Sequence, residues 1–194
     1  MNDPVDTTRS RNRWMLFALF AMFFGAMFIA GVLRFSGWRP HGMKNHGELL
    51  QPPGDLRALA PQLLDGGRYA WEPRARLWRI VVAPPAQCGV RCPRVAEQLF
   101  TVWQLAGHDA DHVHVLWVCP DDACVVPQPL AHAGALRRVR AEPALRAGLP
   151  RNEAGALGLP VYVVDPNGFV ILRYPPGFDP GGLRADLAKL LKLM

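Results

Sequence analysis

Two cysteines at an expected strand–helix junction constrain this chain more than any other feature. The apolar run Leu77–Ala83 predicts a buried strand, and Pro93–Ala106 carries the apolar spacing of an amphipathic helix. Between them lies the motif Cys88-Gly-Val-Arg-Cys92. A helix N-terminus favours thiolates, because its unpaired N–H groups and its dipole stabilise negative charge. The spacing keeps both sulfurs on one side of a turn, within reach of a disulfide or of one soft metal ion.

The four cysteines form two close pairs, Cys88/Cys92 and Cys119/Cys124. An even, paired count is typical of an oxidising compartment or of a metal site. Zinc sites favour tighter C-x-x-C spacings, which counts against zinc. For Cys88 and Cys92 we expect reactive thiols rather than an inert disulfide. For Cys119 and Cys124 we expect a structural disulfide, with a thiol relay or extra thiolate ligands as the alternative.

An uncharged run, Trp14–Leu33, sets the domain organisation. It can span a hydrocarbon core of about 30 Å at about 1.5 Å per helical residue. It is longer than a signal-peptide core and lacks a following A-x-A site, so we expect a retained anchor over a cleaved signal peptide. Basic residues flank both ends and leave the orientation open, whereas the paired cysteines favour an extracytoplasmic domain. The predicted organisation is a cytoplasmic tail (1–13), a transmembrane helix (14–33), a spacer and domain entry (34–76) and a folded domain (77–194).

The folded domain alternates between strand and helix patterns. Beyond the first strand and helix, we predict strands at Val113–Val118, Val161–Val164 and Phe169–Tyr174, weakly helical segments at Leu130–Arg140 and Glu142–Gly148, and a helix at Pro180–Leu193. Asn167-Gly168 predicts a hairpin turn between the last two strands. This order is that of a thioredoxin fold, with an α/β sheet. A right-handed crossover makes the first two strands parallel, so both cysteine pairs and Pro160 should meet at one end of the sheet.

Several functional classes find no support in the sequence. The net charge is +6, but the arginines are scattered and accompany no basic helix or stacking-aromatic motif, so we expect no nucleic-acid partner. No nucleotide-binding loop, Ser/His/Asp set or paired-carboxylate site points to a hydrolase or a kinase. His112 and His114 are expected to be polar residues at the start of a strand rather than metal ligands. Arg137, Arg138 and Arg140 are expected on a solvated helix face.

These features together resemble the Sco/SenC family of thioredoxin-like proteins, which are membrane-anchored and serve copper-centre assembly in cytochrome c oxidase. The matching parts are the Cys88–Pro93 motif after its strand, the Tyr162–Gly168 hairpin and the single N-terminal anchor. The chain is similar in particular to small Sco-like transmembrane proteins found among oxidase-assembly proteins of proteobacteria. Asn45–Leu50 and Asp165–Pro175 look like signatures of that group.

One departure from the Sco pattern concerns copper. In copper-binding Sco proteins a histidine several residues before the Asp-Pro turn joins the two cysteines, but the corresponding stretch here, 152–159, contains no histidine. We therefore expect Cys88 and Cys92 to hold Cu(I) without the usual imidazole. The Leu159-Pro160-Val161 segment instead resembles the place where redox-active thioredoxins carry a cis-proline against their disulfide.

The resemblance implies a membrane-anchored assembly factor that handles thiols, Cu(I) or both in cytochrome c oxidase biogenesis. Cys88 and Cys92 are the expected catalytic and copper-binding residues, with Pro160 beside them. The expected location is the bacterial inner membrane, single-pass, with the C-terminal domain in the periplasm, and the expected partners are oxidase subunits or other assembly factors. Two alternatives remain open: a general periplasmic thiol–disulfide oxidoreductase, and a non-catalytic interaction protein with structural disulfides.

Overall fold

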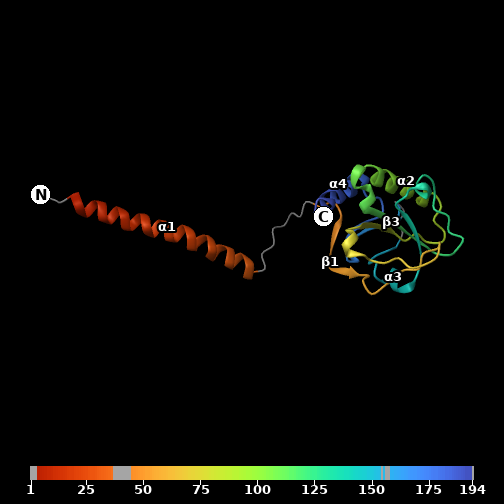
Figure 1. Ribbon diagram of the computed structural model, residues 1–194, viewed down its shortest axis with the longest axis horizontal. Coiled ribbons are helices and arrows are strands. Elements are labelled where there is room, and N and C mark those ends of the chain that lie inside the picture. Colours follow the sequence, from red (N-terminus) through yellow and green to blue (C-terminus); the bar gives the residue numbers. More distant parts are fainter. Residues whose placement is uncertain (1–3, 37–44, 154, 156–157, 194) are drawn as a thin grey trace. The chain divides into compact units, whose positions relative to one another are not determined.

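The chain forms two separate units in a computed structural model (Figure 1). The structure describes residues 4–36, 45–153, 155 and 158–193, with side chains from residue 11 onward. The first unit, Met1–Lys44, holds a single long helix, and the second, Asn45–Met194, holds the sheet and the remaining helices.

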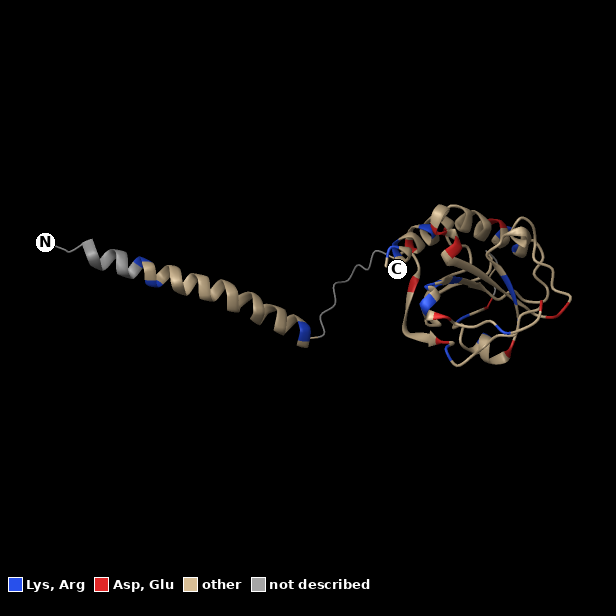
Figure 2. Cartoon of the chain, in the orientation of Figure 1, with Lys and Arg blue, Asp and Glu red and all other residues tan. Residues whose placement is uncertain are grey.

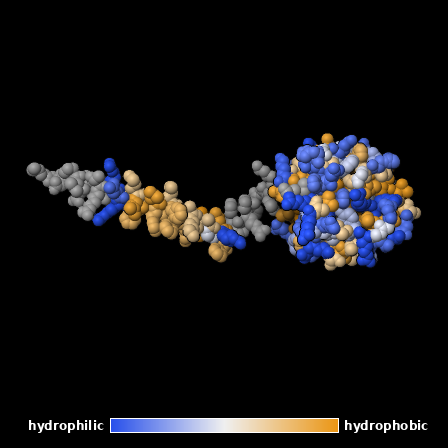
Figure 3. All heavy atoms as spheres, in the orientation of Figure 1, coloured by the Kyte–Doolittle hydropathy of each residue, from blue (hydrophilic) through white to orange (hydrophobic). Residues whose placement is uncertain are grey.

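Helix α1 (Pro4–Phe35) confirms the predicted apolar helix. Its segment Arg11–Phe35 is long and apolar enough to cross a membrane. Figure 2 shows charged residues only near the two ends of this segment, and Figure 3 shows the uninterrupted hydrophobic surface between them. A helix with this surface requires an apolar surrounding, which a bilayer supplies.

The second unit is built on a six-stranded mixed sheet with strand order β1-β6-β5-β2-β3-β4. The strands are β1 (Glu48–Asp55), β2 (Trp78–Val82), β3 (Val113–Cys119), β4 (Leu136–Arg140), β5 (Val161–Val164) and β6 (Phe169–Tyr174). The helices are α2 (Arg91–Gln104), α3 (Pro143–Ala147) and α4 (Pro180–Leu191), with short 3-10 turns η1 (Pro73–Ala75), η2 (Gly107–His112) and η3 (Leu130–His132).

The central strands pair as the sequence predicts. Strands β2 and β3 are parallel neighbours, and β5 lies antiparallel on the other side of β2. The β5–β6 hairpin is antiparallel, and its turn is held by the Asp165 carboxylate, which accepts hydrogen bonds from the backbone N–H groups of Asn167 and Phe169. The expected thioredoxin-like α/β fold is thus confirmed.

Both faces of the sheet are buried, which explains why its central strands are apolar at nearly every position. Along β2, Ile80 and Val82 point into one core cluster, which also contains the inner faces of α2 and α4. The intervening Val81 points into a second cluster on the opposite face, where Leu56 and Leu145 also lie. Figure 1 shows α2 and α4 together over one face and α3 on the other side.

The expected spacer contributes more structure than predicted. The compact unit begins at Asn45 rather than Leu77, because β1 pairs antiparallel with β6 and closes that edge of the sheet. The sequence gives a weak strand signal there, since Pro52, Pro53 and Gly54 interrupt β1. An edge strand tolerates such residues because only one of its sides is paired.

The expectation of a helix over Leu130–Arg140 is wrong. Only the short turn η3 is helical, and Leu136–Arg140 is the edge strand β4, which runs parallel to β3. Pairing with a neighbour outweighs local preference here, since Val139 is fully buried while the flanking arginines are half-buried. The arginines predicted on a helix face therefore lie along a strand.

The start of the folded unit, at His46 and Gly47, is fixed by the buried carboxylate of Asp186 on α4. Asp186, which is only 2 % exposed, accepts hydrogen bonds from the backbone N–H groups of His46 (2.6 Å) and Gly47 (3.0 Å). It also accepts from the Tyr174 hydroxyl at 2.9 Å and from Lys189 at 3.0 Å. This network gives the Asn45–Leu50 signature a structural role, because it fastens the start of β1 to the C-terminal helix.

Candidate functional site

The Cys88–Cys92 pair lies where β2 ends and α2 begins, as predicted. The two residues form a disulfide with their Cα atoms 5.6 Å apart, hereafter the first disulfide. Helix α2 begins at Arg91, so Pro93 is its third residue rather than the first as expected. Proline fits there because the first helical N–H groups have no intrahelical acceptor. Cys92 therefore sits in the first helical turn, and both cysteines are partly exposed.

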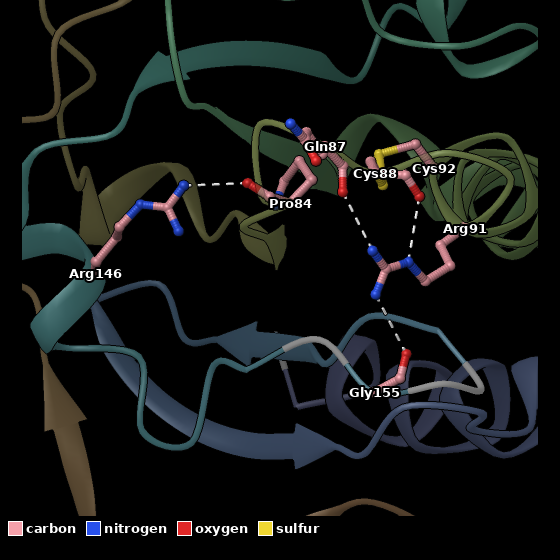
Figure 4. Close-up of a disulfide and its surroundings, with 7 residues drawn as sticks. All are labelled: Pro84, Gln87, Cys88, Arg91, Cys92, Arg146 and Gly155. Carbon is pink, nitrogen blue, oxygen red and sulfur yellow. Dashed lines mark hydrogen bonds between the residues drawn. A yellow bond between two sulfur atoms is a disulfide. The ribbon is translucent and has the colours of Figure 1, made fainter.

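Arg91 holds the loop that carries the first disulfide (Figure 4). Its Nε donates to the Cys88 carbonyl oxygen at 3.2 Å, and one terminal nitrogen donates to the Gln87 carbonyl at 3.2 Å. The other terminal nitrogen reaches the Gly155 carbonyl at 3.5 Å, on the segment that leads to β5. A permanent positive charge and a helix N-terminus thus stand beside Cys88, and both favour a thiolate once the disulfide is reduced.

A second arginine supports the same loop from farther away. Arg146, on α3, donates to the Pro84 carbonyl at 3.1 Å, at the point where the chain leaves β2 (Figure 4). Sequence reasoning missed both arginines as parts of the site. Only Arg91 carried a signal, because it lies inside the Cys88–Cys92 motif.

The second cysteine pair forms a disulfide as well, Cys119–Cys124, with its Cα atoms 5.5 Å apart. Both disulfides meet in one open groove of about 360 Å³, hereafter the shared groove. Its lining residues are Pro84, Pro85, Ala86, Cys88, Gly89, Cys92, Trp117, Pro120, Asp121, Ala123, Cys124 and Val125. The prediction that both pairs open at one end of the sheet is confirmed, and the physical reason is that each follows one of two parallel neighbouring strands.

The four cysteines differ in access. Cys119 is 1 % exposed and belongs to the core cluster, whereas Cys88, Cys92 and Cys124 are partly buried and pack against that cluster. Cys124 is therefore the sulfur of the second pair that borders the shared groove, next to Val125, which is 83 % exposed. Sequence patterns could not rank the two members of this pair.

Pro160 does not line the shared groove. It is buried directly before β5, and among the described residues the cis peptide bonds are Gln51–Pro52 and Gln128–Pro129. The expectation of a cis-proline at this position is therefore wrong. The groove's walls come instead from the loop before α2 and the loop after β3.

Within the described residues, no group of three or more His, Cys, Asp or Glu side chains could hold a metal ion. Cys88 and Cys92, at the groove end of β2, are joined in the first disulfide. His46 is exposed and lies beside Asp186, with its Nδ1 3.6 Å from the carboxylate.

His114 belongs to a buried network around the start of β2, near the β5–β6 turn. Arg79 is fully buried; its Nε donates to the Tyr69 hydroxyl at 2.9 Å, and a terminal nitrogen contacts the Asp165 carbonyl at 3.2 Å. The Tyr69 hydroxyl lies 2.8 Å from His114 Nδ1. Desolvation, and then the positive charges of Arg137 and Arg79, lower the pKa of His114 to about 4. His114 is thus a neutral structural residue, as expected, whereas His112 lies in η2 and is exposed.

Solved structures with the same fold include Sco proteins. A SCO1/SenC family lipoprotein from Bacillus anthracis superimposes with a TM-score of 0.53 at 13 % identity, over 73 % of this chain and 98 % of that one. Copper-bound ScoI from Arabidopsis thaliana gives a TM-score of 0.50 at 15 % identity, over 70 % and 96 % of the two chains. BsSco, described as having a disulfide switch and as a member of the Sco family of cytochrome c oxidase assembly proteins, gives 0.50 at 13 % identity, over 81 % and 100 %.

These identities establish a shared fold, in line with the resemblance seen in the sequence. A search of curated protein sequences gave no significant match. The family model described as the transmembrane-like, thioredoxin-like C-terminal domain matches residues 78–194. That match covers most of the chain and starts at β2, the strand that leads to the first disulfide. The chain therefore belongs to the family of transmembrane-like proteins with a thioredoxin-like C-terminal domain.

Proposed function

We propose that this protein is a membrane-anchored, Sco-like assembly factor that handles thiols and Cu(I) in cytochrome c oxidase biogenesis. The observation that carries the proposal is the first disulfide, which is partly exposed in an open groove at a helix N-terminus beside Arg91. The apolar helix Arg11–Phe35 supports a single-pass anchor in the bacterial inner membrane, and two disulfides support a periplasmic domain. The expected partners are oxidase subunits or other assembly factors.

The redox part of this function is dithiol–disulfide exchange. The reduced Cys88 thiolate attacks one sulfur of a partner protein's disulfide, forms a mixed disulfide and releases the partner's other thiolate. Cys92 then attacks the Cys88 sulfur, closes the first disulfide and leaves the partner as a dithiol. Two electrons pass to the partner. We assign the attack to Cys88 because its loop carries the Arg91 contact and precedes the helix N-terminus.

In the copper-handling part of this function, the reduced Cys88/Cys92 pair binds Cu(I) as cargo for delivery. Two thiolates suit this soft ion, whereas Cu(II) is held poorly without a nitrogen partner. His114 does not contribute a nitrogen, because it lies at the start of β3, whereas Cys119 lies at its end, and its Nδ1 is engaged with Tyr69. The reduced protein is therefore expected to bind Cu(I) and to form no stable Cu(II)–thiolate complex.

Anaerobic Cu(I) titration of the reduced, detergent-solubilised full chain tests this proposal. Wild-type protein should take up one Cu(I) with two protected thiols, and Cys88→Ser should lose that uptake. Cys119→Ser is the matched control, since it removes a thiol that is buried away from the groove. Unchanged copper uptake in Cys88→Ser would contradict the assignment of the site.

A general periplasmic thiol–disulfide oxidoreductase is the second candidate, and the openness of the shared groove favours it. Such an enzyme would reduce or oxidise many protein disulfides and would need no copper. Turnover of a disulfide-bonded model protein, measured without copper, separates this candidate from an assembly factor with one partner. If both copper uptake and turnover are absent, the non-catalytic interaction protein with structural disulfides is the remaining reading.

A further inference from the structure

The second disulfide has no part in the chemistry proposed above, yet it borders the same groove as the first. Cys88 and Cys92 approach the groove from the β2–α2 connection, and Cys124 approaches it from the loop after β3. All three pack against the core cluster that contains Cys119. This arrangement places cysteines of both disulfides at the border of one solvent-open groove.

Each cysteine pair lies just beyond, or at, the end of one of two parallel strands: Cys88 precedes α2 and Cys92 is in its first turn, whereas Cys119 ends β3 and Cys124 follows it. Gly89, between the first two cysteines, has a φ of 56°, and a Cβ built there would meet no atom within 4 Å. In the second loop, Asp121 and Asp122 are exposed, and the Cys124 N–H bonds only locally, to the Asp121 carbonyl at 3.4 Å. Both segments thus have solvent-exposed positions beside their cysteines.

The charges around the two pairs differ. The first pair has Arg91 and the N-terminus of α2 beside it, which stabilise thiolates. The second pair has charges of both signs beside it: Asp121 lines the groove, and Asp122 forms an ion pair with Arg140, which lies opposite Cys119 in the sheet. The Asp122–Arg140 pair is neutral overall, and the Asp121 carboxylate disfavours a neighbouring thiolate. A pair whose reduced form is stabilised is the stronger oxidant, so a single disulfide shared between the two pairs should reside at the second.

We propose that the second pair resolves the first, accepting its disulfide within the shared groove. This inference rests on the proposed function, in which the first pair works as a dithiol. The Cys124 thiolate attacks one sulfur of the first disulfide and releases the other as a thiolate. The Cys119 thiolate then attacks Cys124, closes the second disulfide and releases the first pair as a dithiol. Two electrons move from the second pair to the first, and no external reactant is consumed.

The functional consequence is that one molecule can carry out an exchange at Cys88 and Cys92 and regain a reduced first pair at once. A reduced first pair is the form that can bind Cu(I) or attack another disulfide. A dithiol reductant of the compartment would then reduce the second disulfide again in a separate step.

Migration of a disulfide in the wild-type full chain tests the inference without any substitution. Fully reduced protein in detergent is treated with one equivalent of diamide, alkylated at successive times and mapped by peptide mass spectrometry. The first disulfide should form early and then give way to the second, with a final excess of about tenfold. The rate should not change over a tenfold range of protein concentration, because the transfer is intramolecular. A disulfide that stays at the first pair, or a rate proportional to concentration, would overturn the inference.

Two sets of variants sharpen the test. In Cys88→Ser/Cys92→Ser, oxidation of the second pair by diamide should slow at least about tenfold, because the first pair no longer relays the disulfide; an unchanged rate would count against the relay. Cys92→Ser/Cys119→Ser or Cys88→Ser/Cys119→Ser should form an intramolecular disulfide to Cys124, whereas Cys92→Ser/Cys124→Ser should not. If neither of the first two does so, the sulfurs cannot meet and the relay is wrong. Copper uptake by the first pair is measured separately, so a failed relay leaves the proposed function standing.

Discussion

The Arg91 guanidinium lies against the Cys88 carbonyl, with Nε 3.2 Å from the oxygen, and so a residue inside the motif orients the motif's own first cysteine. The same side chain bonds the Gln87 carbonyl and reaches Gly155, joining the β2–α2 loop to the segment before β5. A single cation therefore holds the loop of Cys88 and places a positive charge next to this residue.

Replacement of Arg91 should make the reduced Cys88 thiol less reactive. In Arg91→Ala the loop loses three hydrogen bonds and the thiolate loses a cation, so alkylation of Cys88 by iodoacetamide at pH 7 should slow by about threefold to tenfold. Arg94→Ala is the matched control, since Arg94 is exposed farther along α2. Equal rates for wild-type and Arg91→Ala protein, followed by mass spectrometry across pH, would show that Arg91 does not activate this thiol.

Removal of the Asp186 charge should destabilise the domain. Burial alone raises the pKa of Asp186, but hydrogen bonds from Gly47, Lys189, Tyr174 and His46 outweigh it and hold the pKa below its ordinary value. Asp186→Asn should lower the free energy of unfolding by about 2–4 kcal/mol, because several donors lose a charged acceptor. Urea denaturation measures this. Asp65→Asn, at an exposed carboxylate paired with Arg138, should cost less than about 1 kcal/mol.

The difference in stability between wild-type and Asp186→Asn protein should depend on pH. Because the folded pKa of Asp186 is lowered, its contribution is present above the unfolded value of about 3.9 and is lost as the pH falls through the folded pKa. The difference in free energy of unfolding between wild-type and Asp186→Asn protein should therefore become smaller below pH 4. A gap that is constant from pH 7 to pH 3 would contradict this account.

His114 should remain neutral in the folded protein well below the pH at which an ordinary histidine becomes charged. Its folded pKa is about 4, so the unfolded chain binds a proton at His114 between pH 6.5 and pH 4 while the folded protein does not. The free energy of unfolding should therefore fall by about 1–2 kcal/mol as the pH is lowered from 6.5 to 4, after allowance for the partial exposure of His114. NMR titration of the His114 ring measures the value directly. The exposed His112 is the internal control, and a similar titration midpoint for both rings would refute the desolvation argument.

Reporter fusions should reveal the topology of the anchor. The apolar helix Arg11–Phe35 and the two disulfides predict that the domain lies on the extracytoplasmic side. Alkaline phosphatase fused after Met194 should be active, and a cytosolic reporter at the same position should be silent. The reverse pattern would overturn the orientation. Retention of residues 1–13 in the membrane-bound protein, read by mass spectrometry, separates an anchor from a cleaved signal peptide.

The sequence by itself determined the long apolar helix, the central strands and the place of the first cysteine pair. An uncharged run of this length is long and apolar enough for a membrane-spanning helix, and strands buried on both faces, such as Val161–Val164, are apolar at nearly every position. The Cys88–Cys92 motif, with the strand before it and the helix after it, also lies within one short stretch of sequence. Each of these signals lies within one short segment, so each could be read without knowing what packs against it.

Only the tertiary structure decided the edges of the sheet and the composition of the groove. Glu48–Asp55 and Leu136–Arg140 become strands because neighbours pair with them, and neither has a strong pattern of its own. Likewise, Trp117 and Cys124 join Cys88 in one groove because the parallel pairing of β2 and β3 aligns two strand ends that lie more than thirty residues apart in sequence. Contacts between distant segments depend on backbone pairing across the sheet, and no local pattern records which strand will be the partner.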